Sequence, residues 1–147
     1  MFRFRFETLL SARRHVEEGL QRELAEARRG LAAEQTALGR KKHARRQCVQ
    51  DRLRQQRQGF RGPDMLLFDA YLHRLERDIE AQQKRVASAE RMVGQRRQAL
   101  LEAVKKRKML ERLKERDLEN HLRLLAEHER KFMDDVAVRS HSVAPRA

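Results

Sequence analysis

Gly59-Phe60-Arg61-Gly62-Pro63-Asp64 is the stretch that decides the fold of this 147-residue chain. It is the only strong cluster of helix breakers in the chain body, and Gly62-Pro63 is expected to interrupt a helix. Asp64 can cap a new helix that starts just before Met65. The stretch therefore predicts a turn at residues 59–64 that joins two helical segments.

Before this turn, apolar residues recur at steps of three, four and seven, as one face of a helix requires. An extra step of four between Leu20 and Leu24 indicates a local relaxation of a supercoil. The pattern predicts a first helix over residues 3–58. The residues with this spacing are Phe6, Leu9, Val16, Leu20, Leu24, Ala27, Leu31 and Leu38. The pattern thins between Arg40 and Gln47 and returns at Val49, Leu53 and Phe60.

A longer apolar pattern follows the turn and predicts a second helix over residues 65–139. The spacing is regular through Val104 and less regular beyond it. Residues 140–147, which include Pro145, are expected to form a disordered tail. The regular part of the pattern consists of Phe68, Leu72, Leu75, Ile79, Val86, Ala89, Val93, Leu100 and Val104.

Folding the segments back at the turn pairs residues whose numbers sum to about 123, since a short connection makes neighbouring helices antiparallel. In this register the basic run Arg40–Arg46 lies opposite Asp78 and Glu80, and Glu17-Glu18 lies opposite Lys105-Lys106. This match of charges favours a hairpin over a parallel dimer. The predicted fold is all-α, one long antiparallel two-helix coiled-coil hairpin over residues 1–139.

The two predicted helices differ in length, at about 85 Å and about 110 Å for a rise of 1.5 Å per residue. The end of the second helix, from about His121 to Arg139, is therefore expected to extend beyond its partner. An apolar stripe without a partner is a candidate binding surface, although such an end can also fold back or fray. The apolar residues of this stripe are Leu122, Leu125, Phe132 and Val136.

The formal net charge is +13, and 39% of the residues are charged, against about 25% in a typical soluble domain. This charge predicts attraction to nucleic acid, an anionic membrane or an acidic protein. Specific nucleic-acid binding is not expected, because acids across the hairpin partly balance the basic runs and the single Tyr71 lies elsewhere. No apolar run approaches the roughly 20 residues that span a bilayer, and the lone Cys48 suits a reducing cytoplasm.

Residue patterns typical of catalysis are missing from the sequence. None of the six histidines has the i,i+4 spacing of a helical metal pair, and one cysteine cannot build a zinc site. Cys48 has no histidine in register to act as its base, and no glycine-rich loop could bind a phosphate. We therefore expect no enzymatic activity, no cofactor and no metal.

Several motifs follow one another along nearly the whole chain. Alternating Phe and Arg lead into Glu7-Thr8-Leu9-Leu10, and a turn headed by Gly59 follows. In this order, length and turn position the chain resembles the FliJ proteins of the bacterial flagellar export apparatus. The remaining motifs of the resemblance are Tyr71-Leu72-His73-Arg74-Leu75-Glu76, Gln82-Gln83-Lys84-Arg85-Val86 and Arg107-Lys108-Met109-Leu110-Glu111-Arg112-Leu113-Lys114-Glu115-Arg116.

The resemblance implies a non-enzymatic stalk or adaptor protein of flagellar type III protein export, and hence a part in flagellum biogenesis, motility and chemotaxis. Such a protein inserts into the hexameric export ATPase, stimulates it, and links it to the cytoplasmic domain of the export gate and to export chaperones. It would be cytoplasmic, reaching the cytoplasmic face of the inner membrane at the flagellar base only through the export apparatus.

The resemblance also implies two contact regions. The gate would be contacted by Tyr71, Leu75, Asp78 and Gln82 on the second helix. Tyr71 and Leu75 both lie close to the apolar seam, so a core role is the alternative for each, and for Leu75 it has at least equal weight. On the first helix, the resemblance leads us to expect aromatic and polar residues at the positions that face this region. In this chain those positions are occupied by Ala37, Lys41, Ala44 and Cys48. The ATPase ring would be contacted by Leu122, Arg123, Leu125, Arg130, Lys131, Phe132 and Val136.

Two other functions stay open at this point. One is the equivalent stalk of a virulence-type secretion injectisome, which would have nearly the same sequence pattern. The other is an unrelated basic coiled-coil scaffold that binds acidic polymers, and its binding would follow total charge.

Overall fold

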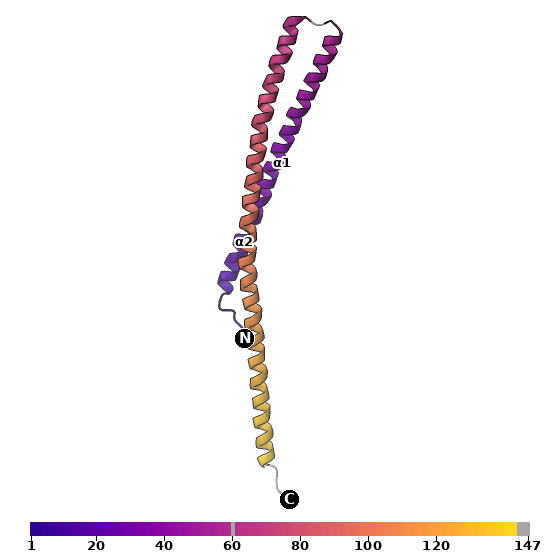
Figure 1. The fold of residues 1–147 in the computed structure, drawn as a ribbon. Coiled ribbons are helices and arrows are strands. Elements are labelled where there is room, and N and C mark those ends of the chain that lie inside the picture. Colours follow the sequence, from indigo (N-terminus) through magenta and orange to yellow (C-terminus); the bar gives the residue numbers. More distant parts are fainter. Residues whose placement is uncertain (60, 144–147) are drawn as a thin grey trace. The chain divides into compact units, whose positions relative to one another are not determined.

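A computed structural model describes residues 1–59 and 61–143, and in this range the fold is all-α (Figure 1). Helix α1 spans Glu7–Arg57 and helix α2 spans Gly62–Val143, and no strand occurs among the described residues. The two helices pack antiparallel on either side of the turn. The predicted all-α helical hairpin is thereby confirmed.

The break between the helices is shorter than the predicted turn. Gly59 has a φ of 85°, in the left-handed region where glycine is favoured because it lacks a Cβ. Pro63 lies inside the first turn of α2, since the first N–H groups of a helix have no partner within it and a proline there loses nothing. Asp64, expected to be the cap, lies in this first turn as well, and its N–H donates to the carbonyl of Arg61 at 3.1 Å.

The helix ends also differ from the expected ones. Helix α1 begins at Glu7, because alternation of Phe and Arg has a period of two and cannot place the phenylalanines on one helix face. Phe4 is buried and packs edge-on against Phe6, with ring centroids 5.9 Å apart. Helix α2 continues past Arg139 to Val143. Residues 144–147 of the predicted tail lie outside the described residues.

Contacts group the chain into two compact units. The turn unit consists of Glu18–Leu101. The terminal unit combines residues 1–17 with α2 from Glu102 onward.

The core of the turn unit is a narrow apolar seam between the helices. Helix α1 contributes Leu24 and Cys48, and α2 contributes Leu75, Ile79 and Val93, all of them buried. Burying one such aliphatic side chain stabilises the folded state by about 1.5–3 kcal/mol. The seam is therefore the main source of stability in this unit.

Ion pairs along the edges of the seam show the register of the turn unit. Arg52 pairs with Asp69 at 3.1 Å, and Arg45 pairs with Glu76 at 3.2 Å. The residue numbers of both pairs sum to 121, close to the predicted register of about 123. The basic run was expected to face Asp78 and Glu80, but the recorded ion pair is made by Glu76, two residues before Asp78 and one helical turn before Glu80.

The terminal unit has a smaller core in which Leu10 is fully buried and Ala103 is buried. Lys114 reaches across to Glu7 at 2.8 Å. Glu17 was expected opposite Lys105-Lys106, but its partner is Arg107. Arg107 lies one turn after Ala103, at the edge of the seam, whereas Lys105 and Lys106 are exposed.

Candidate functional site

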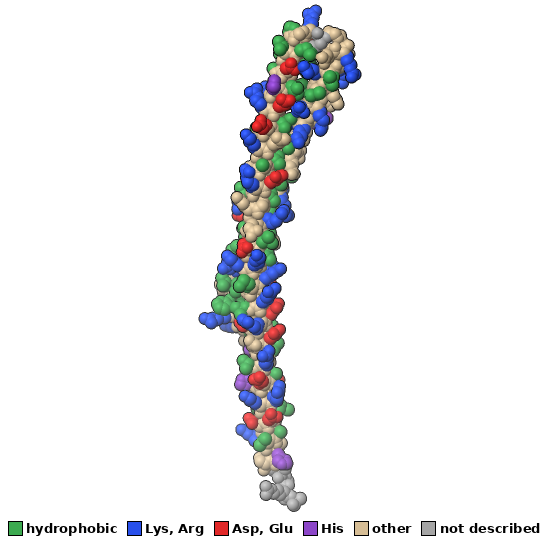
Figure 2. All heavy atoms as spheres, viewed as in Figure 1, with side chains coloured by type: hydrophobic (Ala, Val, Ile, Leu, Met, Phe, Trp, Pro, Cys, Tyr) green, Lys and Arg blue, Asp and Glu red, His purple; other side chains and the backbone are tan. Residues whose placement is uncertain are grey.

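Within the described residues, the C-terminal part of α2 has no covering segment from the rest of the chain after His121. Every described side chain from Leu122 to Ser142 is exposed, and apolar side chains lie between charged ones on it (Figure 2). Phe132, the largest of these apolar side chains, is 67% exposed. An apolar side chain in water makes no favourable burial contribution, so this stretch is suited to binding another surface.

Helical spacing divides this stretch into two faces, since successive residues are about 100° apart. One face carries what we call the C-terminal stripe, whereas Leu124 and Val138 lie on the opposite face. Arg123 and Arg130 lie along one edge of the stripe, and Lys131 lies on the far side. The stripe consists of Leu122, Leu125, Phe132, Met133 and Val136.

The N-terminal segment marks where pairing of α2 ends. The Phe2 ring lies 5.5 Å from the His121 ring, and Phe4 is buried in the same unit. The exposed stretch starts at Leu122, directly after this contact. The predicted boundary near His121 therefore coincides with the last residue that the N-terminal segment covers.

A network of ion pairs joins the two helices of the terminal unit at a part of α2 that precedes the stripe. Arg107 donates to Glu17 across the helices and to Glu111 on α2 at 2.8 Å, and Arg14 lies 3.5 Å from Glu111. Hydrogen bonding to Glu17, and then to Glu111, raises the pKa of Arg107 above its ordinary value. The same hydrogen bond from Arg107 lowers the pKa of Glu111. The network joins α1 to α2 within the terminal unit.

The four residues expected to contact an export gate lie in two different environments. Tyr71 and Asp78 are exposed, and a partner could reach them. Leu75 is 7% exposed and Gln82 is 2% exposed, because both lie in the seam between the helices. Leu75 thus lies in the core, as the alternative interpretation of this residue expected. Of the four residues, only Tyr71 and Asp78 are accessible to a partner.

Gln82 forms a polar layer within the apolar seam. Its side-chain amide donates to the backbone carbonyl of Glu34 at 3.0 Å and to the Glu34 carboxylate. Its amide oxygen accepts from Lys41 at 3.3 Å. Sequence reasoning missed this layer, because a glutamine on a charged helix looks like a surface residue. The signal was the seam spacing, which places Gln82 three residues after Ile79.

The facing positions on α1 belong to the seam rather than to an open surface. Ala37, Lys41 and Ala44 are partly buried, and Cys48 is buried. Burial, followed by the Asp51 carboxylate, raises the pKa of the Cys48 thiol. A thiol that is buried and held protonated is a poor nucleophile.

Two further features bear on function. Among the described residues, no group of three or more His, Cys, Asp and Glu is arranged to hold a metal ion. Neither helix, over its described length, is both long enough and apolar enough to cross a membrane.

Comparisons with known proteins agree with this geometry. Residues 2–146 match the sequence model of the family described as Flagellar FliJ protein. A solved structure described as a candidate YscO homolog from Chlamydia trachomatis has a TM-score of 0.73 and 21% identity, with 97% of each chain covered. At this identity the likeness shows the fold alone. No curated protein matches the chain.

Proposed function

Because the chain belongs to the flagellar FliJ family, whose members are components of flagellar protein export, we propose that it is a non-enzymatic stalk and adaptor of this system. In this proposal the C-terminal stripe enters the ring of the hexameric export ATPase and stimulates it. The observation that carries the proposal is the continuous exposure of α2 from Leu122 to Ser142.

The physical basis is a difference in affinity between ring conformations. A stalk shifts a conformational equilibrium only if it binds one ring state better than another. An exposed apolar stripe with Arg123 and Arg130 along one edge can contact apolar and acidic groups on the inside of a ring. Stimulation of turnover then needs no catalytic group from the stalk.

The finer roles in the proposal concern the other partners. We assign contact with the cytoplasmic domain of the export gate to the exposed pair Tyr71 and Asp78, with Leu75 and Gln82 holding the helix that presents them. Export chaperones are further partners. The protein would then act in the cytoplasm, at the cytoplasmic face of the inner membrane at the flagellar base.

A truncation tests the ATPase role. Deleting residues 121–147 removes five basic and four acidic residues, so the net charge falls by only one. The truncated chain should keep its helical hairpin and lose stimulation of the purified export ATPase. A scaffold that binds acidic polymers through total charge would be almost unaffected by the same deletion. Normal stimulation by the truncated chain would exclude the stripe as the ATPase contact.

A matched pair of variants tests the stripe itself. Leu125→Ser with Phe132→Ser should abolish stimulation, because both side chains lie on the C-terminal stripe. Leu124→Ser with Val138→Ser changes two equally exposed residues on the opposite face and should leave stimulation intact. Equal losses from both pairs would mean that general hydrophobicity, and not the stripe, drives binding.

The injectisome alternative is tested with the same stimulation assay, carried out on an injectisome ATPase beside the flagellar one. The likeness to the YscO homolog concerns the fold, so it does not favour this alternative over the flagellar one. Stimulation of an injectisome ATPase and not of the flagellar ATPase would establish the alternative.

A further inference from the structure

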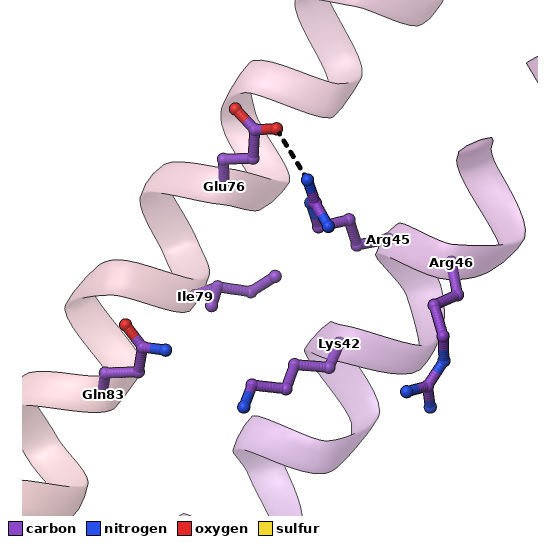
Figure 3. A pocket seen from close by; sticks show the side chains of 6 residues that line it. All are labelled: Lys42, Arg45, Arg46, Glu76, Ile79 and Gln83. Atoms are coloured by element: carbon purple, nitrogen blue, oxygen red, sulfur yellow. Dashed lines mark hydrogen bonds and ion pairs between the residues drawn. The ribbon is translucent and has the colours of Figure 1, made fainter.

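A cationic groove lies in the turn unit, between α1 and α2 (Figure 3). Its volume is about 420 Å³. Figure 3 shows Ile79 pointing from α2 toward α1 between the charged walls. The groove is lined by Lys42, Arg45, Arg46, Glu76, Ile79 and Gln83.

The charge of this groove is poorly compensated. Arg45 pairs with Glu76 at 3.2 Å, and Glu76 also lies 3.7 Å from His73. Lys42 and Arg46 are exposed, and neither makes an ion pair or hydrogen bond within the described part of the chain. Three cations and one carboxylate therefore line the groove.

The sequence around the groove extends this imbalance. Between Glu34 and Asp51, α1 carries five Lys and Arg residues and no acid. The floor of the groove is apolar, since Ile79 is only 8% exposed and belongs to the seam. A ligand in the groove would thus meet positive charge on the α1 wall and an aliphatic surface below it.

This groove is separate from both surfaces in the proposed function. The C-terminal stripe belongs to the terminal unit. At about 100° per residue, Glu76 and Gln83 lie on one edge of the α2 seam, whereas Tyr71 and Asp78 lie on the other. The groove is therefore not part of the surface assigned to the export gate.

We propose that the groove is a docking site for an acidic, amphipathic segment of a partner protein, whose carboxylates pair with Lys42 and Arg46 and whose apolar side chain covers Ile79. Charge complementarity selects an anion, and the recessed apolar floor selects a polypeptide. A flat anionic membrane would meet only the outermost cations. Nucleic acid would need a longer basic track with stacking aromatics, and Glu34 and Asp51 bound this one.

The test uses a labelled amphipathic helical peptide in which Glu and Leu alternate at helical spacing, measured at about 150 mM salt to screen long-range attraction. The full chain should bind this peptide, and the twin peptide with Gln in place of every Glu should not bind. Lys42→Glu with Arg46→Glu should weaken binding at least about tenfold, because it reverses both uncompensated charges.

The control variant is Arg28→Glu with Arg29→Glu, on the same helix and in the same unit, where both side chains are exposed. It changes the net charge by the same amount and should alter affinity by less than about twofold. Helicity and thermal melting by circular dichroism establish that both variants are folded. Equal losses in the two variants would show that total charge drives binding, and the proposal would be wrong.

A gain in binding provides a second test that misfolding cannot imitate. Glu76→Gln removes the carboxylate that occupies Arg45 and should tighten binding of the acidic peptide about two- to fivefold. Single-stranded RNA and phosphatidylglycerol vesicles are the competing probes. Binding of either probe that is lost in the groove variant and kept in the control, without binding of the peptide, would overturn the choice of a protein partner.

Discussion

Two stretches of α2 carry apolar residues at helical spacing, yet their exposure is opposite. In the turn unit, Leu75 is 7% exposed because α1 packs on it. In the terminal unit, Leu124 is 56% exposed and Phe132 is 67% exposed, beyond the residues that the N-terminal segment covers. Both stretches belong to the same continuous helix α2. The difference shows that the apolar pattern only places apolar side chains on the helix. Whether those side chains are buried in a core or exposed for binding depends on whether another segment packs on them.

The strongest test of this comparison uses one substitution at two sites. Leu75→Asp places an unpaired carboxylate in the seam and should lower the free energy of unfolding by several kcal/mol, roughly 3–5. Leu124→Asp should change it by no more than about 0.7 kcal/mol, the difference in helix propensity. Urea titration followed by circular dichroism measures both values. Similar losses at the two sites would mean that α2 is covered over its whole length.

Adjacent glutamines on α2 allow a finer version of the comparison. Gln82→Ala removes a fully buried side chain and leaves Glu34 and Lys41 without their shared partner, so it should cost about 1–3 kcal/mol. Gln83→Ala, one residue along on the exposed edge, should cost less than about 0.5 kcal/mol. The same urea titration distinguishes them. Equal losses of stability in the two variants would mean that the hydrogen bonds of Gln82 do not stabilise the fold.

Replacing glycine by alanine should have opposite effects on the outer face of the helices and in the turn. A Cβ at Gly39 or Gly94 would have no neighbour within 4 Å, so alanine at either position should stabilise the fold by about 1 kcal/mol through helix propensity. Gly59→Ala should instead destabilise it by about 1–2 kcal/mol, because Gly59 has a positive φ. Thermal melting gives the sign of each change. Destabilisation by Gly94→Ala would indicate that another surface covers this face.

The smallest expected effect depends on pH in the terminal unit. Because the hydrogen bond from Arg107 lowers the pKa of Glu111, this interaction stabilises the fold above the ordinary value of 4.5 and is lost as the pH falls below it. The melting temperature should therefore drop on acidification. In Glu111→Gln the drop should be smaller, and a pH profile identical to that of the unchanged chain would show that Glu111 makes no net contribution.

Much of the fold could be predicted from the sequence because it depends on local rules. Periodicity identified two helices, and the Gly59 stretch located the break between them. The register followed from matching apolar seams, and the Arg52–Asp69 pair lies close to it. The predicted start of the second helix was less accurate. Proline disrupts the interior of a helix but is favourable in its first turn, and Pro63 lies in the first turn of α2.

The candidate sites could not be predicted from residue spacing alone, because they depend on how the two helices pack against each other. Tyr71, Leu75, Asp78 and Gln82 share a spacing, but packing leaves two of them at the surface and buries two. Likewise, spacing alone did not show that Lys42 and Arg46 would lack acidic partners in a groove. Pairing of side chains across the seam depends on both helices together, so the pattern of one helix does not show it.

The sequence by itself determined helix type, the position of the break and the excess of positive charge, since each follows from residues near one another in the chain. Only the tertiary structure decided that Gln82 is buried, that Glu17 pairs with Arg107, and that the N-terminal segment ends its cover at His121. These contacts join residues far apart in the chain. Which residues meet depends on how each helix is rotated about its own axis, because neighbouring residues point about 100° apart around a helix.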